Sequence, residues 1–89
     1  MFKKYKRKPV IMEAIQYDGT EEMADKISAE DGFSGVLDYR TGKFGDFYVY
    51  TLNGKVKVRK GDYIMRGIKG EYYPCDPHIF NETYEETEE

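Results

Sequence analysis

The chain has no tryptophan, one cysteine and one histidine among its 89 residues. The lone cysteine, Cys75, excludes a disulfide within the chain and is typical of proteins from a reducing cytoplasm. Cys75 and His78 have the spacing C-x-x-H, but a structural zinc site usually needs a second Cys/His pair, which this sequence lacks. We therefore expect no metal and no other cofactor.

A long apolar run and an excess of basic charge are also missing. A membrane-spanning helix needs about 20 mostly apolar residues, and no such stretch follows the basic N-terminus, so we expect neither a signal peptide nor a transmembrane helix. The net charge is −3, whereas nucleic-acid-binding domains usually carry a basic excess. The charge balance therefore argues against a dedicated nucleic-acid binder.

The charges that are present are distributed unevenly. Residues 1–8 form a basic N-terminal arm with five Lys or Arg, and the last eight residues contain five Glu. We expect residues 85–89 to fray as an acidic tail. We favour the interpretation that both charged ends of the chain are solvated. The alternative is that the basic and acidic ends pair within one chain or between two chains. The length indicates a single domain over residues 1–89.

The sequence offers no pair of a nucleophile and a base, and so we expect no catalytic residue and no enzyme activity. Asp62 and Glu71 flank two successive turns and are the best candidates for an acid–base pair. Carboxylates at such positions more often accept hydrogen bonds from neighbouring backbone N–H groups. We therefore interpret them as turn residues.

Alternation of apolar and polar residues, together with turn residues, predicts an α+β fold. The architecture we expect is a small, curved antiparallel sheet of about five or six strands with one or two short helices, and a partly closed barrel is an alternative. Thr20 and Asp76 are expected N-caps. The expected strands cover residues 9–17, 35–40, 47–52, 55–59, 63–68 and 71–73, and the expected helices cover residues 21–29 and the segment from Pro77 onward.

Two local patterns make sharper predictions. Apolar residues occupy both faces of the segment Pro9–Tyr17, which indicates a central strand or one that is covered on both sides. The pair Asn53-Gly54 is typical of a type I′ hairpin turn, in which both central residues have positive φ. Pro74 is expected to close the strand that precedes it.

Basic and aromatic residues gather in the C-terminal half of the chain. Cations bind phosphate groups and aromatic rings stack on bases, so this set predicts a site for a small anionic nucleotide. The alternative, which we favour, is that the tyrosines pack in the sheet while the charges are solvated. The candidate ligand-binding residues are Arg59, Arg66, Lys69, Tyr72 and Tyr73.

A second candidate surface lies on the expected strand 47–52. Alternation places Tyr48 and Tyr50 on one face, and Phe47 and Val49 on the other. One face should belong to the core, and the face with Tyr48 and Tyr50 is unusually aromatic for a solvated one. It predicts an interaction surface, which together with any uncovered edge strand favours a homo-oligomer.

Three segments together resemble a family of small uncharacterised proteins encoded by bacteriophages and prophages. They are Lys6–Val10, which carries the R-K-P-V part of the family's basic K-x-R-K-P-V start, Gly61–Cys75, which carries the core G-D-[YW]-I-x-x-G-x-x-G-E-[FY]-Y-P-C, and Pro77–Tyr84, which carries the F-x-x-T-Y part of the family's D-x-F-x-x-T-Y finish. The resemblance implies a phage-related source and the cytoplasm of a bacterial host. It implies no activity and no catalytic residue.

Small phage accessory proteins often act by binding, and this association gives the functional expectation. We expect a non-enzymatic accessory binding protein, and the form we would test is counter-defence, in which it binds a host protein or sequesters an anionic nucleotide signal. The first alternative is a structural or assembly-related phage protein that acts only through protein–protein contacts. The second is nucleic-acid binding through the basic N-terminal arm.

Overall fold

The structure is a computed structural model that describes residues 1–6, 10–40 and 45–87. Within these ranges the chain forms six strands and two helices, which confirms the α+β class. The elements are β1 (Glu13–Gln16), α1 (Glu21–Ser28), β2 (Gly35–Asp38), β3 (Asp46–Thr51), β4 (Gly54–Val58), β5 (Tyr63–Arg66), β6 (Tyr72–Cys75) and α2 (Pro77–Thr83).

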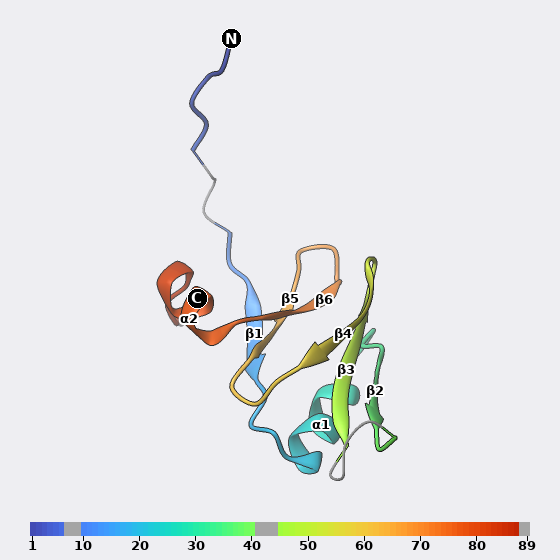
Figure 1. The fold of residues 1–89 in the computed structure, drawn as a ribbon. Coiled ribbons are helices and arrows are strands. Elements are labelled where there is room, and N and C mark those ends of the chain that lie inside the picture. Colours follow the sequence, from blue (N-terminus) through green and yellow to red (C-terminus); the bar gives the residue numbers. More distant parts are fainter. Residues whose placement is uncertain (7–9, 41–44, 88–89) are drawn as a thin grey trace.

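The strands form two antiparallel sheets rather than one, with the orders β1–β5–β6 and β2–β3–β4 (Figure 1). Neither sheet closes into a barrel. Between β4 and β5 the chain turns at Gly61, which has φ 95°, and there the Asp62 N–H donates to the Arg59 carbonyl. Because this link is not a hairpin, β5 does not join the β2–β3–β4 sheet and pairs with β1 instead.

Aromatic rings connect the two sheets through a shared core. Phe47 of β3 packs on Tyr17 with ring centroids 5.1 Å apart and on Phe33 at 5.9 Å, and Phe33 meets Tyr72 of β6 edge to face at 5.2 Å. Each ring removes a large apolar area from water, which lets a chain of this size build a core without tryptophan. Strands β3 and β6 therefore lie against each other across the sheets.

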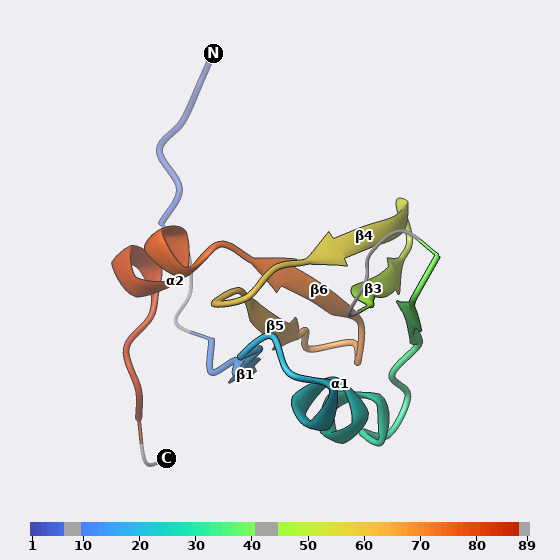
Figure 2. The same cartoon turned by 60° about the horizontal axis from the view of Figure 1, so that its bottom comes forward.

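Helix α1 covers this core with the face that its sequence spacing predicts. Ala24 and Ile27 are buried and Met23 is half-buried beside them. The Thr20 hydroxyl accepts a hydrogen bond from the Met23 N–H at 3.1 Å, which confirms the expected N-cap. Figure 2 shows α1 beneath the strands and α2 beyond the end of β6.

Helix α2 begins as expected and is held by stacked rings. The Asp76 carboxylate accepts from the His78 N–H at 2.9 Å, and Pro77 occupies the first helical turn. The Phe80 ring lies 3.7 Å from that of Tyr63 in β5 and nearly parallel to it. This contact attaches α2 to the face of the β1–β5–β6 sheet that is opposite Ile64, because neighbouring residues of a strand face opposite sides.

Three local expectations were wrong. Strand β1 is an edge strand and is mostly exposed, because β5 pairs with it on one side only; Pro9 lies outside the described residues. Pro74 lies inside β6, where an edge strand tolerates the missing N–H. In the β3–β4 hairpin Thr51 pairs with Gly54, and Asn53 does not have positive φ, so the turn is not type I′.

Candidate functional site

Arg66 and Tyr72 are opposite each other on β5 and β6, so two of the predicted ligand-binding residues do meet. The Arg66 Nη1 donates to the Tyr72 hydroxyl at 3.3 Å, and the guanidinium carbon lies 5.9 Å from the tyrosine ring centroid. The Tyr72 hydroxyl donates in turn to the Asp31 carbonyl at 2.7 Å. These bonds tie Arg66 to the loop that follows α1.

Two carboxylates already hold the Arg66 guanidinium. Its Nη2 lies 2.8 Å from Glu13 Oε2 of β1, and its Nη1 lies 3.6 Å from Glu30 Oε2. The hydrogen bond to Glu13, followed by the one to Tyr72, raises the pKa of Arg66 above its ordinary value. With one cation and two anions this cluster carries a net charge of −1, so an incoming anion would have to displace glutamate from Arg66.

A cavity of about 270 Å³ lies behind this cluster. Its apolar wall includes Ile27 of α1 and Ile64 of β5, which are both buried in the core. The Arg66 cluster stands at the polar side of the same cavity. The arrangement combines an apolar wall with a slightly acidic rim, which is a poor match to a nucleotide phosphate.

The other predicted ligand-binding residues do not join Arg66 and Tyr72 on one face. Tyr73 follows Tyr72 in β6 and therefore points to the opposite side of the sheet. Arg59 follows β4, in the other sheet. Lys69 lies in the β5–β6 turn, where its backbone N–H donates to the Glu71 carboxylate at 3.1 Å.

Asp62 and Glu71, the candidates for an acid–base pair, both have turn contacts. Asp62 Oδ2 accepts from the Arg59 N–H at 2.9 Å, and Glu71 Oε2 accepts from the Lys69 N–H. Each carboxylate thus satisfies a backbone donor in its own turn. This geometry matches our interpretation of them as turn residues.

A larger groove of about 430 Å³ lies where the β3–β4 turn, the β5–β6 turn and the loop after α1 meet. Tyr50 and Leu52 line it from the first hairpin, and Glu71 and Tyr73 line it from the second. The side chains of Leu52 and Tyr50 are 98% and 48% exposed. The groove therefore joins Tyr50 of the predicted interaction surface to Tyr73 of the predicted ligand site.

Tyr48, the other member of the predicted interaction surface, is placed differently. Lys55 of β4 lies with its Nζ 4.3 Å from the centroid of the Tyr48 ring, and the ring is half-buried. Lys57, the residue opposite Tyr48 in the register, forms an ion pair with Asp46 at 3.5 Å. The Lys55 side chain thus lies over the Tyr48 ring, and Tyr50 is the more exposed tyrosine of that face.

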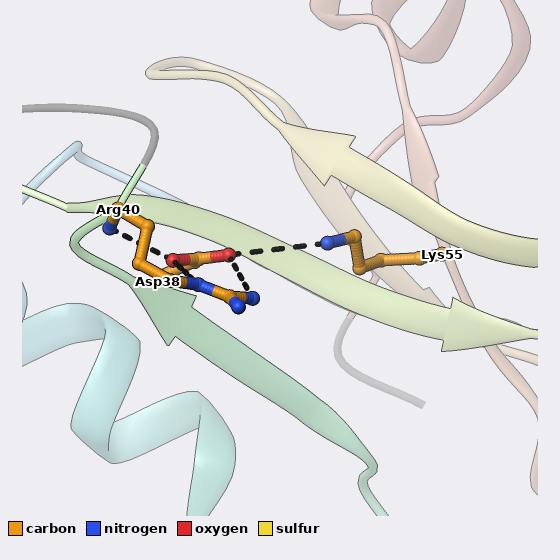
Figure 3. Close-up of polar contacts among 3 residues, drawn as sticks. All are labelled: Asp38, Arg40 and Lys55. Carbon is orange, nitrogen blue, oxygen red and sulfur yellow. Dashed lines mark hydrogen bonds and ion pairs between the residues drawn. The ribbon is translucent and has the colours of Figure 1, made fainter.

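Sequence reasoning missed the buried carboxylate of Asp38 at the end of β2, shown in Figure 3. Asp38 accepts hydrogen bonds from the backbone N–H of Arg40 at 2.9 Å and from its Nε and Nη2 at 3.1 Å each. Lys55 Nζ of β4 lies 4.0 Å away. The hydrogen bonds from the Arg40 side chain and backbone lower the pKa of Asp38 to about 2. The D-x-R spacing was the available signal.

The lone cysteine has the features of a structural residue. Cys75 is half-buried, and burial, together with the charges of Asp76 and Asp62, raises the pKa of its thiol, which disfavours the thiolate. Among the described residues no group of three or more His, Cys, Asp or Glu is placed to bind a metal. Neither of the two described helices has the length and apolar character needed to cross a membrane.

No family model, curated protein or solved structure matches the chain. The likeness to phage and prophage proteins therefore depends on the three sequence segments alone.

Proposed function

We propose that the chain is a non-enzymatic phage or prophage accessory protein that acts by binding another protein, with the groove between the two hairpin turns as the docking site. The observation that carries this proposal is the exposure of Leu52 and Tyr50 at the rim of an open groove. Contiguous exposed apolar surface on a small domain is typical of sites of protein contact. The resemblance to phage and prophage proteins favours a partner in the bacterial host cell.

A protein partner fits this chain better than a small anion. The groove offers aromatic and aliphatic side chains, which supply most of the binding energy at protein interfaces. Arg66, the central cation of the nucleotide hypothesis, is held by Glu13 and Glu30. Sequestration of a nucleotide signal remains a prediction, and it would require Arg66 to exchange these partners.

Site-specific photo-crosslinking in bacterial host cells tests the proposal. A benzophenone amino acid replaces Leu52, whose exposed side chain makes the change compatible with folding. The matched control carries the same amino acid at Ile79 of α2, which is also exposed but lies outside the groove. We expect a covalent protein adduct from position 52 and none from position 79.

Two results would contradict the proposal. Absence of any adduct at position 52, with the protein folded and expressed, would remove the groove as a docking site. Equal adducts at positions 52 and 79 would indicate unspecific contact. Loss of the position-52 adduct on adding Tyr73→Ala, which truncates the far wall of the groove, would strengthen the assignment.

A further inference from the structure

We infer that the partner seated in the groove is the basic N-terminal arm of a second copy of this chain. The inference rests on the proposed function, because it names the occupant of the same groove. Each arm docks on the other copy, so the two contacts are equivalent and the assembly closes as a two-fold dimer. Phe2 and Tyr5 supply the apolar contacts.

Charge separation within the chain favours this occupant. The arm contains five of the 14 basic residues and none of the 17 acidic ones, so it carries +5 while the remaining 81 residues carry −8. The negatively charged body of a second copy therefore attracts the positively charged arm. Within the groove, Glu71 lies on the wall and Asp31 directly precedes the lining residue Gly32. Lys69 in the β5–β6 turn offsets part of this local negative charge. The attraction for the arm therefore comes mainly from the net charge of the remaining 81 residues rather than from the groove alone.

The arm also carries aromatic surface that its own body does not cover. Phe2 is fully exposed and Tyr5 is 89% exposed. Phenyl and phenol rings gain free energy when they leave water, and a groove with Tyr50, Leu52 and Tyr73 offers them matching surface. The exposed rings of the arm and the exposed rim of the groove therefore complement each other.

The position of the arm points to a second copy rather than to its own groove. Both views show residues 1–6 projecting away from the body, on the same side of it as α2, whereas the β3–β4 hairpin lies on the other side (Figures 1 and 2). The 12 residues before β1 span up to about 40 Å when extended, at about 3.3 Å per residue. That reach is enough to cross to a neighbouring molecule.

The first test measures the molar mass of the full chain by light scattering as its concentration rises. We expect a dimer for the natural sequence and a monomer for two variants, the arm variant Phe2→Ala/Tyr5→Ala and the groove variant Leu52→Asp. All three positions are highly exposed, so the variants should keep their fold, which circular dichroism verifies. The control Ile79→Asp places the same charge on an exposed site outside the groove and should remain dimeric.

Mixing the two defective variants distinguishes docking between copies from docking within one. The arm variant keeps a functional groove and the groove variant keeps a functional arm, so a mixed pair regains one of the two contacts. We expect the mixture to show dimers that neither variant forms alone. A mixture that stays monomeric would indicate that the arm docks on its own body, which overturns the inference.

A disulfide test locates the contact. In a Cys75→Ser background, Lys4→Cys and Asn53→Cys should form a disulfide-linked dimer on oxidation with diamide, whereas Lys4→Cys with Glu22→Cys on α1 should not. Equal crosslinking in both pairs would overturn the inference. So would a natural chain that is monomeric in light scattering, or a dimer that persists in either the arm variant or the groove variant. If position 52 then still crosslinks to a different protein, the inference fails and the proposed function stands.

Discussion

Asp38 is the buried charged residue among the residues that the structure describes. Its side chain is 5% exposed, yet it stays ionised because Arg40 donates three hydrogen bonds and Lys55 is 4.0 Å away. Burial alone would favour the protonated form, so the lowered pKa shows that the hydrogen bonds outweigh desolvation. This carboxylate connects the end of β2 to β4 across the central strand β3.

Replacement of Asp38 should change how stability depends on pH. The carboxyl titrates near pH 4 in the unfolded chain and at about 2 in the folded one, so its stabilising effect is complete above about pH 4 and is lost as the pH falls toward 2. We expect Asp38→Asn to be less stable at pH 7 and to lose less stability between pH 4 and pH 2. Urea unfolding at a series of pH values measures this, with the exposed Asp25→Asn as control. A pH profile unchanged from that of the natural chain would contradict it.

Glu13 and Glu30 should determine whether the Arg66 site accepts an anion. Replacing both with Gln changes the charge of the cluster from −1 to +1 while keeping similar shapes. We expect the affinity for a nucleoside monophosphate to rise by about tenfold, which corresponds to about 1.4 kcal/mol. Titration calorimetry measures this effect, with Glu22→Gln/Glu82→Gln as a control of equal charge. Equal gains in both variants would show that net charge, not the cluster, is responsible.

At the scale of secondary structure, the pairing of β2 with β3 requires a glycine at its first position. A Cβ on Gly35 would meet the backbone carbonyl of Tyr48 and the ring of Phe33. The φ angle of Gly35 is not positive, so the constraint is the close approach of the neighbouring strand rather than backbone strain. Because a carbonyl within a ladder cannot move without disturbing its hydrogen bonds, the strands would have to separate.

We expect Gly35→Ala to destabilise the fold by about 1–3 kcal/mol, the range typical of added volume at a tightly packed site. The control is Ser34→Ala, at the exposed neighbouring position, which should stay within about 0.5 kcal/mol of the natural chain. Urea unfolding compares the two. Equal stabilities would mean that β3 accommodates the methyl group and that the close approach is not a constraint.

Elements that depend on near neighbours were the predictable ones. The N-caps Thr20 and Asp76 and the buried face of α1 were expected from the sequence, because each involves residues within one or two turns. The β3–β4 turn was expected one residue too late and with the wrong geometry, because its central residues are Leu52 and Asn53 rather than Asn53 and Gly54. The Thr51 hydroxyl accepts a hydrogen bond from the Asn53 N–H and donates one to the Gly54 carbonyl. These side-chain hydrogen bonds stabilise a turn geometry other than type I′.

At the scale of the whole molecule, the separation of charge between arm and body should make self-association depend on salt. Ions screen the attraction between the +5 arm and the −8 body, so the dimer dissociation constant should increase between low and high ionic strength. Sedimentation at several salt concentrations measures it. The triple variant Lys3→Gln/Lys4→Gln/Lys6→Gln should associate more weakly and with a smaller salt dependence. An association that strengthens with salt would indicate that apolar contact alone drives it.

The sequence by itself determined the α+β class, the approximate positions of the elements and which residues of β3 share a face, because these follow from alternation, helical spacing and turn residues. Only the tertiary structure decided that the strands divide into two sheets and that β1 lies at an edge. It also decided that Glu13 and Glu30 neutralise Arg66, and that Tyr50 and Tyr73 share a groove. These contacts join residues far apart in the chain, and their pairing depends on how the whole core packs rather than on any local preference.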